Sequence, residues 1–418
     1  MKDNESIELQ YMALEFDTHN PLKMESIWKA DVKAKTGAEP IVNLSSPEDR
    51  QRQTDYFKFI TDYIADGIQH QINEKRIDPS KKGRLTIVAA PEFMFTDVHD
   101  PAHSDQAGQP FNADVAAQGK SYMAAKLKSF TGNLLVFPGS VWWWEQYTIT
   151  KKEEAGAAIA KSLNYRVAMQ KVYDHWDKYL SLKKAGRAKE SDAEKQTALD
   201  LLKEADKVAN GIKAEVSSGE VQLAGMLDIA IHNSAPAFFN GTNIHNWNKK
   251  NLSQLDGLGT PSKTFGPSTH WDAFVTGQGW SATVLDVGDP SPCFTVNVDG
   301  VDVNIGVEVC LDHIVDQGVL AKNVDRVVDV HMLLAAGMPA EYVACRKGGV
   351  FLRAEGGAGR GGSRSNCGIR TNAVVPANEP SDAFEWDTGR PTGDLDHRVV
   401  IFRPVTITGS TKVAKVTA

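Results

Sequence analysis

Cysteine is scarce in this sequence, with four residues, Cys293, Cys310, Cys345 and Cys367, among 418. No two of them form a Cys-x-x-Cys pair, so neither a zinc ribbon nor a thioredoxin-type redox site is expected. Four cysteines are also too few for a disulfide scaffold in a chain of this length. We therefore expect reduced thiols, which suit nucleophilic chemistry.

Long apolar runs and long basic runs are lacking as well. No stretch of about 18 apolar residues occurs, which argues against a transmembrane helix and a membrane partner. The segment 1–6 has no apolar core of the secretory type, so a cytoplasmic protein is the default expectation. The formal net charge is −7 and no run of lysine and arginine offsets it, which argues against a nucleic-acid partner.

The patterns that are present predict an α/β fold. Hydrophobic residues make up 41% of the chain and charged residues 24%, as in soluble globular proteins. Period-two and period-3.6 patterns then alternate over the first part of the chain. Strands are expected at 6–16, 85–92 and 133–141, and helices at about 45–72 and 113–130. Alternation of strand and helix is typical of α/β folds.

This alternation stops between about Glu145 and Leu227, where the chain becomes charged and rich in alanine. Two helical stretches are expected there, joined by a hinge at 183–187, and Ser191 opens the second with a capping box. We predict that 145–227 is a helical hairpin inserted into the α/β domain. It can be a solvated lid without function or a cover for the substrate.

After the insertion the strand pattern returns. Strands are expected at 227–232, 293–298, 303–309, 325–334, 349–354 and 397–402, and a short helix at 340–347. Asp299-Gly300 is a hairpin turn signal before the strand that ends at Cys310. The glycine cluster 356–362 lacks the Gly-Lys-Ser/Thr ending of a phosphate loop, so a flexible loop is expected.

Three reactive residues stand where a predicted strand ends: Glu92, Lys249 and Cys310. In α/β sheets, functional sites gather at the carboxyl ends of strands. A cysteine at a sharp turn after a buried strand is held rigidly, and the backbone N–H groups of that turn can face a carbonyl oxygen. The alternative for Cys310 is a small buried core residue.

These segments resemble the nitrilase superfamily of carbon–nitrogen hydrolases, whose triad is Glu-Lys-Cys in chain order. Pro-Glu after a strand matches the family glutamate at Glu92, and Gly-x-x-x-Cys-x-Asp matches its cysteine at Cys310. The aromatic-x-Lys-x-polar-Leu pattern of 247–252 matches its lysine at Lys249 rather than at Lys250. The resemblance covers about 6–145 and 228–405. It departs after the cysteine, where His-Ile-Val-Asp replaces the arginine and the aromatic-Pro-Glu of many members.

The resemblance implies a fold and a mode of assembly. The chain 1–418 is expected to form a single carbon–nitrogen hydrolase-like domain, a four-layer α-β-β-α sandwich with 145–227 inserted. A second copy is expected to pair with it, giving a homodimer or a higher homo-oligomer.

The resemblance also implies a reaction. Cys310 is expected to attack an amide of a small-molecule substrate and to form a thioester, with Glu92 as general acid and base. Lys249 and the backbone N–H of Leu311 are expected to stabilise the oxyanion. A cationic lysine also favours a thiolate. Nitrile and carbamoyl or ureido substrates suit the same triad, and neither a metal nor an organic cofactor is needed.

Other interpretations remain open. A papain-type site could pair Cys310 with His331, His245 or His270, although no signature links these residues. A binding protein with a decayed site is the non-enzyme alternative. Trp142, His313 and His331 are possible pocket residues, though His331 in an apolar strand also suits a core position, and packing alone can explain Trp142.

Overall fold

The computed structural model describes residues 6–18, 21–40, 50–97, 110–150, 171, 175, 178–179, 181–217, 223–250, 281–283, 291–314, 318–320, 328–340, 342–356, 364–371, 384–394 and 397–408. The chain divides into two compact units, each built from separate segments. The first unit comprises Met1–Trp143, Asn233–Asn251 and Pro290–Ala418. The second unit comprises Trp144–His232 and Leu252–Asp289.

The larger sheet has the strand order β15-β16-β1-β2-β4-β6-β5-β3, with β17 beside β1 and with β7 and β8 beside β6. Its strands are β1 (Ser6–Phe16), β2 (Arg84–Ala89), β3 (Phe111–Asn112), β4 (Leu134–Phe137), β5 (Val141–Thr150), β6 (Leu223–Phe239), β7 (Thr242–Asn248), β8 (Ser281–Thr283), β15 (Arg390–Asp394), β16 (His397–Ile401) and β17 (Val405–Thr408). β1, β2 and β4 run parallel, so their carboxyl ends meet at one edge.

The smaller sheet lies wholly in the first unit and has the order β14-β13-β12-β11-β10-β9. Its strands are β9 (Cys293–Val298), β10 (Val301–Val309), β11 (Val328–Ala335), β12 (Cys345–Glu355), β13 (Asn366–Arg370) and β14 (Phe384–Asp387). β10, β11 and β12 are parallel neighbours. Asp299 and Gly300 both have positive φ, 51° and 97°, which confirms the predicted hairpin turn between β9 and β10.

The two sheets face each other across one buried core. Alternate residues of β2 (Leu85 and Ile87) and of β10 (Ile305 and Val307) point into it. The period-two alternation of β10 in the sequence therefore marks the face that the larger sheet covers. Burial of this apolar face holds the strand that leads to the cysteine.

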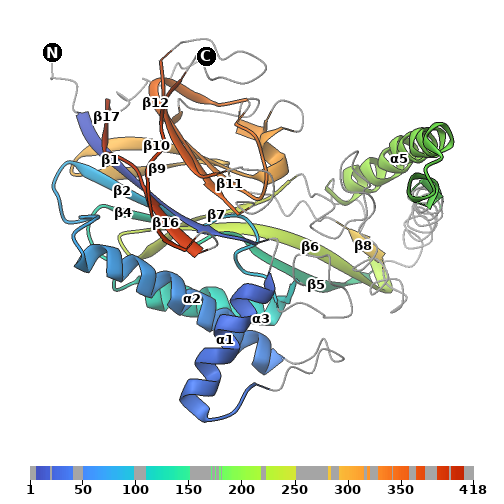
Figure 1. Cartoon of the computed structure of the whole chain (residues 1–418), viewed down its shortest axis with the longest axis horizontal. Coiled ribbons are helices and arrows are strands. Elements are labelled where there is room, and N and C mark those ends of the chain that lie inside the picture. The colour runs from blue at the N-terminus through green and yellow to red at the C-terminus, as the bar shows by residue number, and fades with distance from the viewer. Residues whose placement is uncertain are drawn as a thin grey trace. The chain divides into compact units, whose positions relative to one another are not determined.

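Three helices pack on the other face of the larger sheet: α1 (Pro21–Thr36), α2 (Arg50–Asn73) and α3 (Ala113–Leu127). Figure 1 shows them on the side of β1, β2 and β4 away from β9–β12. On α2 the buried Tyr56, Ile60 and Ile64 recur every four residues, which gives one apolar stripe. The fold is mixed α/β with two sheets, and helices cover the larger one.

The structure corrects two expected elements. The helix predicted at 340–347 is wrong, because β12 begins at Cys345 and pairs there with Val328 of β11. Cys345 is fully buried in that pairing, so tertiary contact outweighs the helical propensity of its neighbours. The single strand predicted at 133–141 is in fact two, β4 and the start of β5, since Gly139 between them turns the chain with a φ of 103°.

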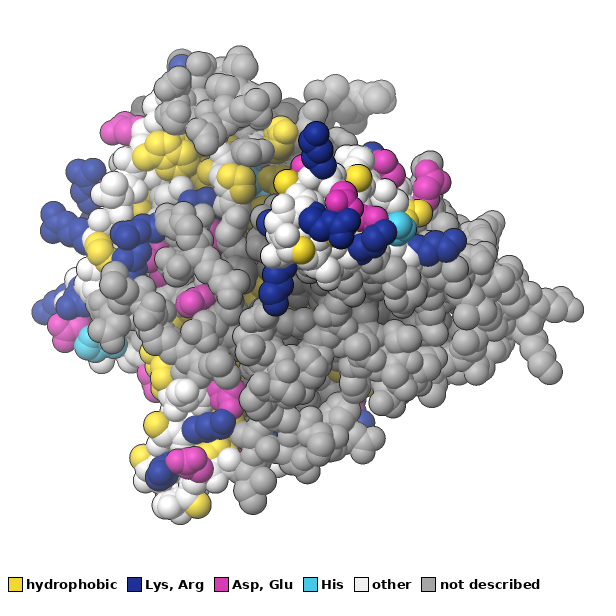
Figure 2. Space-filling model, turned by 45° about the vertical axis from the view of Figure 1, so that its right-hand side comes forward, with side chains coloured by type: hydrophobic (Ala, Val, Ile, Leu, Met, Phe, Trp, Pro, Cys, Tyr) yellow, Lys and Arg dark blue, Asp and Glu magenta, His cyan; other side chains and the backbone are white. Residues whose placement is uncertain are grey.

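In the second unit, residues 181–184 are helical, a turn follows at Ala185-Gly186, and α5 (Ala188–Ser217) begins after it. The helix start predicted at Ser191 is wrong, because Ser191 lies inside α5 and its hydroxyl donates to the carbonyl of Ala188 at 2.8 Å. Glu194 of α5 accepts a hydrogen bond from Nδ1 of His175 at 2.6 Å. β5 continues to Thr150 and β6 begins at Leu223, so strand structure extends into both ends of the segment 145–227. Figure 2 shows Lys and Arg side chains interspersed with Asp and Glu side chains on the described part of the surface that faces the viewer. Within the described residues, no helix is long and apolar enough to cross a membrane.

Candidate active site

Glu92 lies in a tight turn directly after β2. The turn is fixed by Ser140, whose Oγ accepts a hydrogen bond from the backbone N–H of Phe93 at 2.9 Å. Phe93 has a φ of 57°, which a side-chain-bearing residue seldom adopts. Gly139 packs against this turn so closely that an added Cβ would lie 2.7 Å from the carbonyl oxygen of Pro91. The carboxyl group is therefore held at the end of β2 by surrounding backbone.

Lys249 follows β7, and its Nζ donates to Oε1 of Glu92 at 2.7 Å. Both side chains are 0% exposed, so the structure contains a fully buried ion pair. Lys249 Nζ also lies 5.6 Å from the centre of the Phe93 ring. The adjacent Lys250 is only partly buried and has its ammonium over the ring of Trp247, at 5.3 Å. Of the two lysines, Lys249 is the one that faces Glu92.

Asn233 of β6 is a further member of this group, and the sequence analysis did not identify it. Its Nδ2 donates to Oε1 of Glu92 at 3.1 Å, and its carbonyl accepts the backbone N–H of Lys249 at 2.8 Å. A signal for it exists, because Asn240-Gly241 is a hairpin turn dipeptide with φ values of 49° and 71°. That turn pairs β6 with β7 and brings Asn233 opposite the lysine.

Cys310 directly follows β10 and begins a short 3₁₀ turn, Cys310–His313. Its φ is 46°, in the left-handed region, and the residue is 1% exposed. A non-glycine residue persists in that region only when its surroundings determine it, and such residues cluster at functional sites. Leu311, the predicted oxyanion residue, is the half-buried second residue of this turn, and its carbonyl accepts the N–H of Ile314 at 3.3 Å.

Asp312 joins the cysteine turn to the end of β7. Its Oδ2 accepts the indole N–H of Trp247 at 3.0 Å, and its Oδ1 accepts the backbone N–H of Lys250 at 3.0 Å. These two bonds fix the turn that carries Cys310 against the strand end that carries Lys249. The structure thus links all three predicted catalytic residues, Glu92 and Lys249 directly and Cys310 through its turn.

The thiols of Cys345 and Cys367 have pKa values that burial raises. Burial raises the pKa of Cys345 to about 12, and burial also raises the pKa of Cys367 far above its usual value. Both groups are protonated at neutral pH for that reason. All four cysteines are free and buried. Among them Cys310 is the one with a left-handed backbone at a strand end.

His313 and His331, two of the possible pocket residues, belong to a fully buried cluster with Glu308. Oε2 of Glu308 lies 2.6 Å from Nδ1 of His313 and 2.9 Å from Nε2 of His331, and its Oε1 accepts the backbone N–H of Leu320 at 2.7 Å. Burial alone raises the pKa of Glu308, but the two histidines outweigh burial and hold that pKa below its usual range. The cluster lies on the face of the smaller sheet opposite the core that the two sheets share.

The same three side chains have the donor types of a metal site, with ligand atoms within 4.8 Å of one another. However, the backbone N–H of Ala344 donates to Nδ1 of His331 at 3.1 Å, so the ring proton of His331 is on Nε2. A histidine that binds a metal through one nitrogen almost always donates the N–H of the other. His331 has the reverse arrangement, which is that of a hydrogen-bond network. Both of its nitrogens are engaged, so it is also a poor base for Cys310.

Trp142 and His245 are buried and each packs against a phenylalanine ring. Trp142 is buried and packs edge-on against Phe93, with ring centres 5.6 Å apart. It therefore stands beside the turn that carries Glu92. His245 stacks on Phe294 at 4.6 Å, and burial lowers its pKa from 6.5 to about 4. His270 lies outside the described residues.

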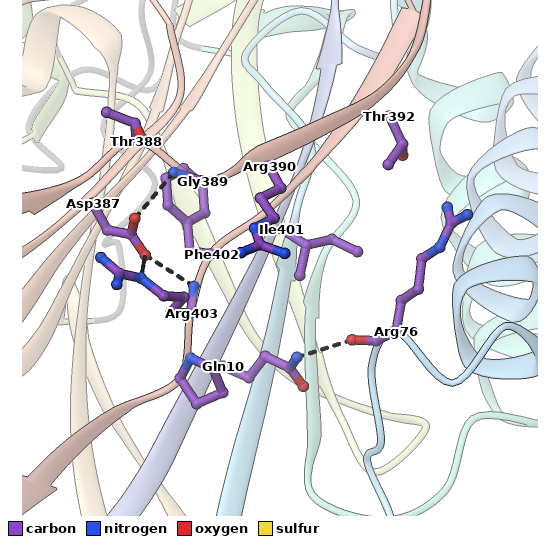
Figure 3. A pocket seen from close by; sticks show the side chains of 11 residues that line it. Gln10, Arg76, Asp387, Thr388, Gly389, Arg390, Thr392, Ile401, Phe402 and Arg403 are labelled. Carbon is purple, nitrogen blue, oxygen red and sulfur yellow. Dashed lines mark hydrogen bonds and ion pairs between the residues drawn. The ribbon is translucent and has the colours of Figure 1, made fainter.

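A cavity of about 640 Å³ lies elsewhere in the first unit. Figure 3 shows Gln10 donating to the carbonyl of Arg76 on one side, and Arg403 beside Asp387 on the other. Arg390 also lines it. None of its described lining residues belongs to the Glu92–Lys249 pair or to the cysteine turn.

No family model and no curated protein matches this chain. Among solved structures, one match is a glutamine-dependent NAD(+) synthetase from Cytophaga hutchinsonii, with 11% sequence identity and a TM-score of 0.32. The match covers 96% of this chain and 43% of that chain, so this chain spans less than half of the length of its match. The functional assignment therefore rests on the geometry of Glu92, Lys249 and Cys310.

Proposed function

We propose that the protein is a cysteine-dependent hydrolase of a non-peptide carbon–nitrogen bond, acting on an amide of a small molecule. The observation that carries this proposal is the fully buried Lys249–Glu92 ion pair, tied to the turn of a left-handed, strand-end Cys310. A buried ion pair is costly to keep out of water and is weak support for stability, so a role in chemistry explains its presence better.

Each residue has a distinct role in the proposed reaction. Glu92 takes the thiol proton while the sulfur of Cys310 bonds to the amide carbon, and the ammonium of Lys249 offsets the charge on the oxyanion. The backbone N–H of Leu311 is proposed as the second oxyanion donor. Glu92 then protonates the nitrogen, the carbon–nitrogen bond breaks, and a thioester remains. Water then attacks the thioester and gives a proton to Glu92. The carbon–sulfur bond breaks, the acid leaves, and Glu92 returns the proton to the sulfur of Cys310.

Asn233 and Asp312 hold this arrangement in place. Asn233 and Lys249 donate to the same oxygen of Glu92. Asn233 therefore orients the carboxyl group, and the ammonium of Lys249 stays close to that carboxyl group. Asp312 sets the position of the cysteine turn against β7. We also propose that the first unit is a four-layer sandwich of the nitrilase-superfamily type, which the second unit interrupts.

Turnover of a substrate panel by matched variants tests this function. Ammonia or amine release is measured for simple amides, nitriles and N-carbamoyl compounds. Cys310→Ala and Glu92→Gln should lose activity by about 10³-fold or more, since the residues of a catalytic group act as a unit. Cys293→Ala removes another buried cysteine and should retain wild-type activity. Wild-type protein quenched in acid during turnover should carry the acyl group of the substrate on Cys310 by mass spectrometry, whereas Glu92→Gln, which lacks the proton acceptor for acylation, should carry none.

Several outcomes would contradict the proposal. Wild-type turnover by Cys310→Ala would exclude the thiol as the nucleophile. Tight binding of an amide without turnover or adduct would instead indicate a binding protein. Turnover confined to nitriles or to N-carbamoyl compounds would keep the three roles and change the substrate class.

A further inference from the structure

We propose that Glu308 is a positioning residue for Cys310, acting through His313 at the far end of the cysteine turn. This inference rests on the proposed function, in which the turn carries both the nucleophile and an oxyanion donor. Glu308 precedes Cys310 on β10, and His313 closes the 3₁₀ turn. The 2.6 Å hydrogen bond between their side chains therefore spans the turn from the strand to its last residue.

The protonation states in this cluster follow from its hydrogen bonds. Ala344 N–H donates to Nδ1 of His331, which leaves Nε2–H to donate to Oε2 of Glu308. Leu320 N–H donates to Oε1 of the same carboxylate. Two of the three contacts of Glu308 are thus fixed N–H donors, and an ionised carboxylate accepts all of them. The remaining contact is the Nδ1–H of His313.

The cluster holds its members tightly because neighbouring elements leave little space. Gly318 has a φ of 89°, and a Cβ added there would lie 3.3 Å from Oε1 of Glu308 and 3.1 Å from the carbonyl of His313. His331 is fixed from the other side by Phe351, whose ring meets it edge-on at 5.1 Å. The carboxylate is thus a rigid anchor, and its hydrogen bond to His313 restrains the turn.

A rigid anchor explains how Cys310 keeps its left-handed backbone. The turn is fixed at two points, since Asp312 binds the end of β7 and His313 binds Glu308. With both bonds in place, the residues between β10 and His313 have no freedom to relax to an ordinary φ. Loss of the His313 bond would release one end and let the thiol and the N–H of Leu311 move from their positions.

Two variants of His313 separate this role from general stability. In His313→Asn the amide nitrogen occupies the place of Nδ1, so the bond to Glu308 is kept. In His313→Gln the amide nitrogen occupies the place of Nε2, so that bond is lost while size and charge stay matched. Asp329→Asn is the control, because Asp329 is equally buried on the same sheet but binds Arg346 at the other end of the strands.

Amide hydrolysis and hydrogen exchange are measured for each variant. We expect His313→Gln to lower kcat by about 10- to 100-fold with KM unchanged, because small misplacements of reacting groups cost that much. Exchange in the peptide containing 309–314 should become faster. His313→Asn should stay within about threefold of wild type in kcat, and Asp329→Asn should leave the exchange of that peptide unchanged.

Equal kcat in His313→Asn and His313→Gln would overturn the positioning role, whether both are active or both impaired. Hydrogen exchange tests the positioning role without relying on hydrolytic activity, and so independently of the proposed function. If the wild type hydrolyses no carbon–nitrogen bond, the function is wrong, and the exchange difference between the two variants still decides whether Glu308 and His313 hold the turn.

Discussion

The Lys249–Glu92 pair makes a quantitative prediction about stability. The perturbations are Lys249→Met, Glu92→Gln and the two together. Each single change leaves one buried charge without its partner, because both side chains are 0% exposed, and should cost about 3–5 kcal/mol. The double variant keeps an amide that Asn233 can still bond. Its cost should therefore fall short of the sum of the single costs by about 2 kcal/mol or more.

A second pair in the same protein provides the control. Lys35 and Asp31 of α1 lie at the same distance, 2.7 Å, but are 71% and 32% exposed. Exposed pairs four residues apart on a helix couple by only about 0.3–0.5 kcal/mol. Urea unfolding, followed by tryptophan fluorescence, gives the free energy of unfolding of each variant and hence the coupling energy of each pair, provided that the m-value stays constant. A coupling at Glu92–Lys249 no larger than at Asp31–Lys35 would refute the claim that burial makes this pair strong.

Three further predictions concern single residues. His245 stays neutral in the fold because burial lowers its pKa from 6.5 to about 4. Unfolding lets it take up a proton below pH 6.5, so His245 should lower the free energy of unfolding by about 3 kcal/mol between pH 7 and pH 4. Urea midpoints of His245→Phe should lack this contribution. Gly139→Ala should destabilise the protein by about 1–3 kcal/mol in thermal unfolding, because Gly139 has a φ of 103° and a Cβ there would meet Pro91 O at 2.7 Å. Cys345, with a pKa raised by burial to about 12, should resist iodoacetamide at pH 8 in the native protein and react in urea, as mass spectrometry would show.

The elements that the sequence predicts well are those with a local cause. β1 occupies 6–16 as expected, because its pattern of apolar residues is that of a strand. The Asp299-Gly300 turn needs only two residues that tolerate positive φ. α1 was not expected, although Met24, Trp28 and Val32 recur every four residues and pack in the core beneath the helices.

The parts of the site that the sequence does not reveal depend on contacts between distant segments. The type and position of Glu92 can be predicted, but its bond to Asn233 depends on how β2 and the hairpin of β6 and β7 pack together. Asp312 could be expected to hold the cysteine turn. Its partners, Trp247 and Lys250, are known only from the fold. Glu308 alternates with apolar neighbours in β10, so its sequence context suggests an ordinary solvent-facing position, whereas the fold covers it.

Three of the four points at which the chain passes between the two units lie, in the sequence, within a few residues of Trp142, Asn233 or Lys249. The segment Trp144–His232 begins shortly after Trp142 and ends directly before Asn233. The segment Leu252–Asp289 begins shortly after Lys249. Two of these junctions fall inside strands of the larger sheet, since Trp144 lies in β5 and His232 in β6. Insertion or deletion of one residue in β6 beside Asn233 would shift the alternation of that strand and turn the Asn233 side chain away from Glu92, so the candidate site constrains the length of the chain at this junction.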